Sequence, residues 1–246
     1  MNKVPMKAVV LAAGKGTRLQ TEGNTLPKVM RLAAGKPLLE HVLTSLDFIV
    51  PQDIVIVVGY KKECVIEAFP GYIFAEQKEQ LGTGHAVMSA FSQLEDYDGS
   101  LLVCCGDMPL IKQETYKALI DAHNSSDNVC TILSGTSDAD LPYGRILRNE
   151  NGDFYGVVED KDATPEQKKI KELNSGVYVF DAKTLRGVLS ELKRDNAQGE
   201  YYLTDAPVLL QKSGYKIGVC RRELGFEIIG VNTPEQLMKI EELLLK

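Results

Sequence analysis

The chain has 246 residues, of which 44% are apolar and 25% are charged, and it contains no tryptophan. This composition is typical of an ordinary folded domain and excludes a disordered or collagen-like chain. The formal net charge of −6 argues against a nucleic-acid partner, because binding to a phosphate backbone needs a basic face. Any phosphate that the chain binds must therefore meet a few local cations.

Five cysteines are present, an odd number without CxxC spacing, so the sequence indicates neither a disulfide framework nor a zinc cluster. A reducing, cytoplasmic location fits this usage best. The first ten residues lack the apolar core of a secretory signal, and no stretch approaches the roughly 20 apolar residues of a membrane span. We therefore expect no membrane partner.

Apolar runs and amphipathic segments alternate in the first half of the chain. The run KAVVLAA at residues 7–13 is typical of a strand buried on both faces, and it leads directly into Gly14. Further strands are predicted at 53–58, 72–75, 100–105 and 128–134, and helices at 37–46, 63–69, 85–94 and 113–124. Repeated βα units predict an α/β fold, a Rossmann-like, open, mostly parallel but mixed sheet with helices on both faces. Ligands of such sheets bind beyond the carboxyl ends of the strands.

The pattern changes after Gly144. Strands are predicted at 145–148, 153–159 and 172–180, with a hairpin turn at 149–152 (NENG), which indicates a small antiparallel region on the substrate side. Helices at 182–193 and 203–212, short strands at 216–220 and 227–231, and a final helix from Pro234 complete the expected elements.

A glycine-rich loop from Leu11 to Leu19 (LAAGKGTRL) follows the first strand, and Lys28 comes soon after it. Small residues after a buried strand let backbone N–H groups approach an anion, and Arg18 and Lys28 can add two permanent charges. The loop has neither the GxGxxG pattern of dinucleotide-binding proteins nor the GxxxxGK[ST] pattern of P-loop enzymes. The loop therefore predicts a phosphate site of another class.

Asp107 stands at the carboxyl end of a predicted central strand, in the segment CCGDMPL. An aspartate at a strand end is a helix cap in many proteins, but this position favours a ligand. Mg²⁺ takes only one or two protein oxygens and completes its shell with water and phosphate, so one such carboxylate suffices.

Eight segments occur in one order over nearly the whole chain: LAAGKGTRL with LPKV, AEQKEQLGTGHA, GDMPLI, YGRI, VVEDKDATPEQ, LNSGVYVF, NAQGEYYLTD and GVNTPEQL. With these segments the chain resembles the sugar nucleotidyltransferase family, and within it the N-terminal uridylyltransferase domain of the bifunctional bacterial enzymes that make UDP-N-acetylglucosamine. The resemblance implies nucleotide-sugar biosynthesis from UTP and N-acetylglucosamine 1-phosphate, with pyrophosphate as the second product and Mg²⁺ as cofactor.

The resemblance also implies roles for individual residues. Arg18, Lys28 and Asp107 would be catalytic, and Asp107 with Asn232 would hold Mg²⁺. The nucleotide would contact Leu11, Ala12, Ala13, Gly14, Gly16, Thr17, Gln77, Gly82, Thr83 and Gly106, with Gln77, Gly82 and Thr83 reading the uracil. The sugar phosphate would contact Gly144, Glu159, Asn174, Tyr201 and Thr204.

The resemblance predicts one nucleotidyltransferase domain over 1–246, with a nucleotide-binding half over about 1–140, a sugar-binding half over about 141–232 and a C-terminal helix over 233–246. The relatives continue into a β-helix acetyltransferase domain, which this sequence does not contain. We therefore expect a monomer or weak oligomer, and a separate acetyltransferase partner stays open.

Three features depart from the family or stay open. Cys105 stands where the family commonly has tyrosine, the linker from Gln20 to Thr25 is longer than usual, and His85 is expected to cap or pack rather than to catalyse. Two other functions stay open: the same reaction with another sugar 1-phosphate, such as glucose or glucosamine 1-phosphate, on a uridylyl or thymidylyl donor, and a non-catalytic nucleotide-sugar sensor. The complete phosphate and metal set argues against the sensor.

Overall fold

The computed structural model describes residues 6–19, 25–136 and 141–245. Of the linker from Gln20 to Thr25, the structure describes only Thr25. The strands of the whole described structure are β1 (Met6–Leu11), β2 (Leu32–Ala33), β3 (Lys36–Pro37), β4 (Ile54–Val58), β5 (Ile73–Glu76), β6 (Ser100–Cys105), β7 (Cys130–Thr136), β8 (Arg145–Arg148), β9 (Phe154–Val158), β10 (Glu172–Asp181) and β11 (Ile217–Arg222). Its helices are α1 (Leu38–Ser45), α2 (Lys62–Ala68), α3 (Thr83–Ala90), α4 (Gln113–Asn124), α5 (Ala182–Leu189), α6 (Asp205–Lys212) and α7 (Pro234–Leu244), joined by short 3-10 turns.

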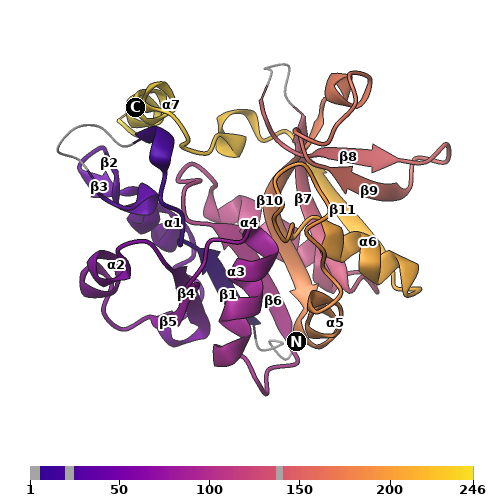
Figure 1. Ribbon diagram of the computed structural model, residues 1–246, viewed down its shortest axis with the longest axis horizontal. Coiled ribbons are helices and arrows are strands. Elements are labelled where there is room, and N and C mark those ends of the chain that lie inside the picture. The colour runs from indigo at the N-terminus through magenta and orange to yellow at the C-terminus, as the bar shows by residue number, and fades with distance from the viewer. Residues whose placement is uncertain (1–5, 20–24, 137–140, 246) are drawn as a thin grey trace.

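Within the described residues, one nine-stranded mixed sheet forms the centre of the molecule, in the order β11-β7-β10-β6-β1-β4-β5 with the β8–β9 hairpin attached to β10 (Figure 1). Strands β6, β1, β4 and β5 pair in parallel, as do β7 and β11. Strand β10 is antiparallel to both of its main neighbours, β6 and β7. The predicted mixed, mostly parallel sheet is thus confirmed.

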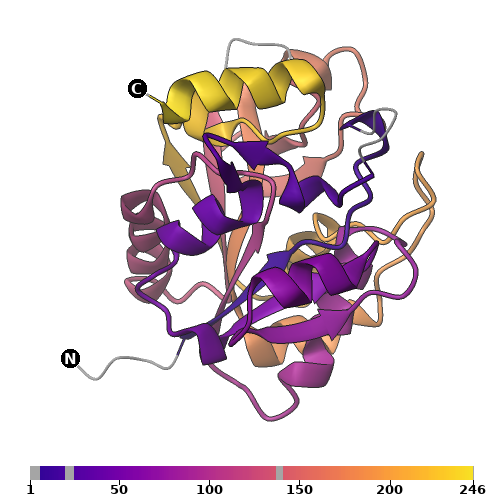
Figure 2. The same cartoon turned by 90° about the vertical axis from the view of Figure 1, so that its left-hand side faces the viewer.

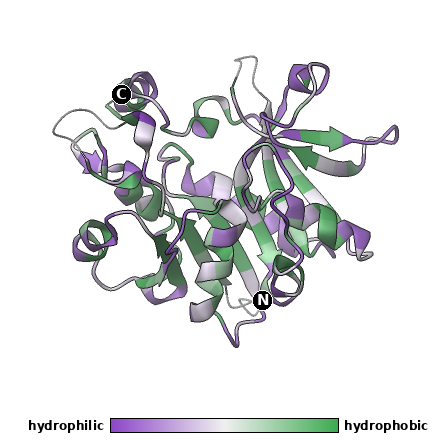
Figure 3. Cartoon of the chain, viewed as in Figure 1, coloured by the Kyte–Doolittle hydropathy of each residue, from purple (hydrophilic) through white to green (hydrophobic). Residues whose placement is uncertain are grey.

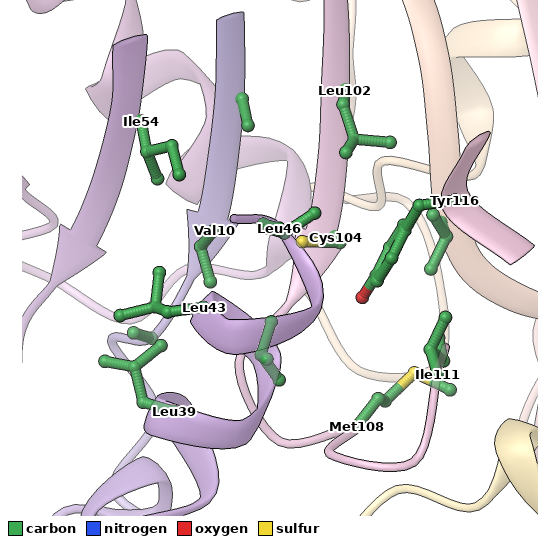
Figure 4. Close-up of a cluster of buried hydrophobic side chains, with 14 of the residues drawn as sticks. Val10, Leu39, Leu43, Leu46, Ile54, Leu102, Cys104, Met108, Ile111 and Tyr116 are labelled. Atoms are coloured by element: carbon green, nitrogen blue, oxygen red, sulfur yellow. The ribbon is translucent and has the colours of Figure 1, made fainter. Parts of the chain in front are cut away.

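Helices cover both faces of this sheet. The central strands are nearly continuous runs of apolar residues, which is the pattern of strands that are buried on both sides (Figure 3). On one face, strand residues such as Val10, Ile54 and Leu102 pack against α1 and α4 through Leu43 and Tyr116 (Figure 4). On the other face, the buried side chains come from α3, α5 and α6.

One predicted strand, 227–231, is wrong. Residues Gly225–Ile228 form a 3-10 turn instead. The Glu227 carboxylate accepts hydrogen bonds from Lys112 N over 3.1 Å and from Thr115 Oγ1 over 2.6 Å, at the N-terminus of α4. A carboxylate is favoured at a helix N-terminus, and this contact holds the chain in a turn.

Helix α7 closes the fold beside the glycine-rich loop (Figure 2). It begins with a capping box, in which Thr233 Oγ1 accepts from Gln236 N and the Gln236 side chain accepts from Thr233 N. Ile240 on this helix is fully buried in a cluster with Leu19, Ala33, Leu38 and Val231. The loop end at Leu19 is therefore anchored to the C-terminal segment.

A short two-stranded ribbon without a clear sequence signal contributes Ala33 to this cluster. Strands β2 and β3 pair through a two-residue turn, Ala34–Gly35, in which both residues have positive φ (50° and 78°). No helix in the described ranges is long and apolar enough to cross a membrane.

Candidate active site

The glycine-rich loop leaves β1 at the carboxyl edge of the sheet. Its first residues are tied to neighbouring backbone, because Ala12 N donates to Val57 O over 2.9 Å and Tyr60 N donates to Ala13 O over 3.3 Å. Gly16 has φ +63°, and a Cβ there would lie 2.8 Å from Lys28 Cβ, so glycine is required. The N–H groups of Gly14, Gly16 and Thr17 donate to no residue within the described ranges, which leaves them for an anion.

The Lys28 ammonium lies between two side-chain oxygens that come from distant parts of the chain. Its Nζ forms an ion pair with Asp107 Oδ2 and donates a 2.8 Å hydrogen bond to Asn232 Oδ1. Arg18 Nη2 donates to the same Asn232 oxygen over 3.3 Å. The Lys28 and Asp107 side chains are only 16% and 18% exposed. Four residues predicted to handle phosphate or metal thus form one contact group.

Asp107 and Asn232 are held at this spacing by the backbone. Val231 N donates to Asp107 O over 2.9 Å, which places the residue before Asn232 directly on the β6 end. No group of three His, Cys, Asp or Glu side chains gathers around a possible metal position in the described part of the chain. One carboxylate and one amide oxygen, both directed at the Lys28 ammonium, are nevertheless ligands that suit a hard divalent cation with few protein contacts.

A pocket of 270 Å³ lies between the glycine-rich loop and the start of α3. Gln77 on its wall is 3% exposed, and its Nε2 donates to Gly82 O over 3.0 Å. Gly82 has φ +109°, and a Cβ there would lie 2.6 Å from Tyr201 O, so no other residue fits this turn without strain. The predicted residues that line this pocket are Leu11, Ala13, Gly14, Lys28, Gln77, Gly82, Thr83 and Asp107.

A second pocket of 180 Å³ lies on the other side of Asp107. Asn174 on its wall sits where β10 bulges away from β7, and its amide is held at both ends. Asn174 Oδ1 accepts from Gly176 N over 3.2 Å, and Nδ2 donates to the hydroxyl of Tyr178 over 2.7 Å. The predicted residues that line this pocket are Asp107, Gly144, Glu159, Asn174 and Asn232.

Glu159 is a half-buried carboxylate in the second pocket. Burial raises its pKa above the ordinary value, and the neighbouring carboxylates of Asp162 and Asp205 act in the same direction. Thr204 Oγ1 donates to Glu159 Oε1 over 2.9 Å, which opposes that rise. Thr204 is itself 4% exposed, so the structure places it behind Glu159.

The two pockets share Cys105 and Asp107 as lining residues. Gly106 between them donates its N–H to Leu11 O over 2.9 Å, and a Cβ there would meet Leu11 O at 3.2 Å. Burial raises the pKa of the Cys105 thiol, so this residue stays neutral and does not act as a nucleophile. The two pockets therefore meet beside Lys28 and Asp107.

Some predicted residues line neither pocket, and some residues that line a pocket were not predicted from the sequence. The predicted residues that line neither pocket are Ala12, Gly16, Thr17, Arg18, Gly106, Tyr201 and Thr204. Tyr143, which lines the second pocket and accepts from Gly230 N over 2.7 Å, and Glu200, which lines the first, were not identified from sequence. Tyr178 was also missed, although a hydroxyl inside the apolar run VYVF is a signal for a buried polar contact.

The chain matches a known protein family over most of its length. Residues 8–203 match the family described as the MobA-like NTP transferase domain. The chain is 45% identical over 238 residues to the bifunctional protein GlmU of Streptococcus thermophilus and 44% identical over the same length to that of Streptococcus mutans, covering 96% of this chain and 51% of each relative. The chain thus spans about half the length of the curated relatives that it matches.

A solved structure has a similar fold. It comes from Bacillus anthracis, is assigned as a glucose-1-phosphate thymidylyltransferase and is in complex with a sucrose. The TM-score is 0.73 at 20% sequence identity, over 97% of this chain and 95% of that chain. At this identity the likeness shows a shared fold alone.

Proposed function

Because the chain belongs to the MobA-like NTP transferase domain family, we propose that it transfers a uridylyl group from UTP to N-acetylglucosamine 1-phosphate, forming UDP-N-acetylglucosamine and pyrophosphate. The observation that carries this proposal is the pair of pockets that meet at Asp107. A transfer between two phosphate-bearing molecules needs two sites that share one reacting position. Lys28 beside that position supplies the charge that such a transfer requires.

The first pocket suits the nucleotide. Gln77 and the start of α3 offer amide and backbone groups at one end, and Gly14 and Lys28 offer phosphate contacts at the other. The second pocket suits the sugar phosphate, because Glu159 and Asn174 can accept and donate hydrogen bonds to hydroxyl groups, and the Gly144 backbone lies beside them. We assign Tyr201 and Thr204 to the support of these walls, since neither lines a pocket.

The reaction forms a bond between a phosphate oxygen of the sugar phosphate and the α-phosphorus of UTP, and breaks the bond from that phosphorus to the oxygen that leaves with pyrophosphate. The attacking oxygen is already anionic at neutral pH, so no general base is needed. Lys28 and Arg18 would offset the charge on the transferring and leaving phosphates. Mg²⁺ held by Asp107 and Asn232 would supply further charge neutralisation when bound.

The proposal includes a cytoplasmic location. All five cysteines are free, which is typical of a protein from a reducing compartment. The partners that the proposal requires are two small molecules, and the acidic net charge argues against a polynucleotide.

Release of pyrophosphate tests the proposal. The purified chain is assayed with UTP, CTP, ATP, GTP and TTP against N-acetylglucosamine, glucosamine and glucose 1-phosphates, with Mg²⁺ and with EDTA. We expect UTP with N-acetylglucosamine 1-phosphate to give the highest kcat/KM, and EDTA to abolish release. Highest activity with another sugar would reassign the acceptor, and no release with any pair would leave a nucleotide-sugar sensor as the better reading.

A further inference from the structure

We propose that His85 is a positioning residue that fixes the Gln77 amide in the orientation that selects uracil over cytosine. The proposal rests on the proposed function, because it takes the first pocket as the UTP site. His85 lies on α3 and lines neither pocket. Its effect on the nucleotide must therefore act through Gln77.

The orientation of the Gln77 amide follows from its two neighbours. Nε2 lies 3.0 Å from Gly82 O, and a backbone carbonyl can only accept, so this atom of the amide must be the nitrogen. The same Nε2 lies 3.1 Å from His85 Nδ1. Both hydrogens of the amide nitrogen are thus directed at the protein, and only Oε1 is left for a ligand.

The same contact defines the state of the imidazole. Because Nε2 of Gln77 donates, His85 Nδ1 must accept, so the ring is neutral and carries its proton on Nε2. The ring is held in place by Tyr201, whose ring stacks on it with centroids 6.2 Å apart. Tyr201 is fixed in turn by backbone hydrogen bonds of 2.8 Å from Gly84 N and to Leu81 O.

The pocket then presents a defined pattern to a base. Gln77 Oε1 is an acceptor, and the N–H groups of Gly82 and Thr83 at the start of α3 donate to no residue in the ranges that the structure describes. An acceptor beside donors complements the N3–H of uracil and its flanking carbonyl oxygens. Cytosine has an unprotonated N3, which would face Oε1 with two acceptors in contact.

Loss of the acceptor on His85 leaves one hydrogen of Gln77 Nε2 without a partner inside a nearly buried site. An unsatisfied donor of this kind costs free energy, and the hydrogen bond to Gly82 O alone then holds the amide, so orientations that direct N–H groups at the base become more populated. The orientation that reads uracil is then less populated, and discrimination against cytosine falls.

Two variants separate this role from packing. His85→Phe keeps an aromatic ring against Tyr201 and removes the acceptor, whereas His85→Asn loses the ring and can place its amide oxygen where Nδ1 lies. Steady-state kinetics are measured for both with UTP and with CTP, and thermal melting confirms that each is folded. We expect His85→Phe to raise the KM for UTP roughly 5- to 10-fold, to lower the preference for UTP over CTP by a similar factor and to leave kcat and the KM for the sugar phosphate within twofold.

His85→Asn is expected to recover most of the UTP preference. An unchanged preference in His85→Phe, or an equal loss in both variants, would overturn the inference while leaving the proposed function intact, because wild-type activity with UTP is measured first. Wild-type protein that turns over no UTP would overturn the proposed function and this inference together.

Discussion

Replacement of Lys28 by methionine tests the centre of the proposed site. The ammonium is the cation on which Asp107 and Asn232 converge, and it also lines the nucleotide pocket. Removal of one such donor from a site of developing charge costs about 3 kcal/mol of transition-state stabilisation, which corresponds to a loss of roughly 150-fold in kcat/KM. Methionine keeps most of the side-chain volume, so the loss reports on charge.

The fold should survive this change. Asp107 lines both pockets, so water can reach the remaining carboxylate, and we expect a loss of about 1 kcal/mol in unfolding free energy, or roughly 2–4 °C in Tm. Lys36→Met is the matched control, because Lys36 pairs with Glu40 over 2.9 Å at an exposed position that lines neither pocket. Pyrophosphate release and thermal melting are measured for both. Activity of Lys28→Met within threefold of the Lys36→Met control would refute the role of Lys28.

Three further changes probe the pocket walls. Tyr178→Phe removes the acceptor that holds Asn174 Nδ2, and we expect the KM for the sugar phosphate to rise about 5-fold with the KM for UTP unchanged; equal rises in both would contradict the assignment. Glu159→Gln should raise the KM for the sugar phosphate about 10-fold. Because burial raises the pKa of Glu159, its ionised form opposes folding, so the variant should be more stable than wild type near pH 7. This gain in stability should vanish below the ordinary pKa of 4.5, which thermal melts across pH will test. Gly82→Ala forces a Cβ against Tyr201 O at 2.6 Å and φ +109°, so a loss of about 1–3 kcal/mol is expected in chemical denaturation, and an unchanged midpoint would show that the turn adapts.

The alternation of elements was predictable because each has a local signal. The buried strands carry apolar runs, and the helices carry amphipathic spacing, so β1, β4, β6 and α4 follow from their own residues. The place of β10 between β6 and β7 was not predictable: the sequence indicated a small antiparallel region, and no local signal shows that this strand joins the central sheet. The false strand at 227–231 has the same origin: its apolar residues look extended, and the long-range contact of Glu227 with α4 decides the outcome.

The residues of the candidate site also differ in whether a local sequence pattern predicts them. Lys28 and Asp107 carried local signals, a basic residue after a glycine-rich loop and a carboxylate at a strand end. Asn232 had none, because an asparagine before a proline-initiated helix reads as a turn residue, and only the resemblance identified it. The roles of Tyr178 and His85 depend on which atom faces which across the fold, and a sequence does not contain that information.

The insertion of β10 has a consequence for engineering. The strand belongs to the sugar side of the proposed site, yet it supplies the hydrogen-bonding neighbour of β6, whose end carries Asp107. A fragment that stops near residue 140 would leave β6 with an open, apolar edge and would be prone to aggregate. Acceptor preference is therefore better redesigned in the β8–β9 hairpin and at the β10 bulge than by exchanging whole halves between relatives. A chimera that replaces β10 also replaces the strand that pairs with β6 of the nucleotide-binding half.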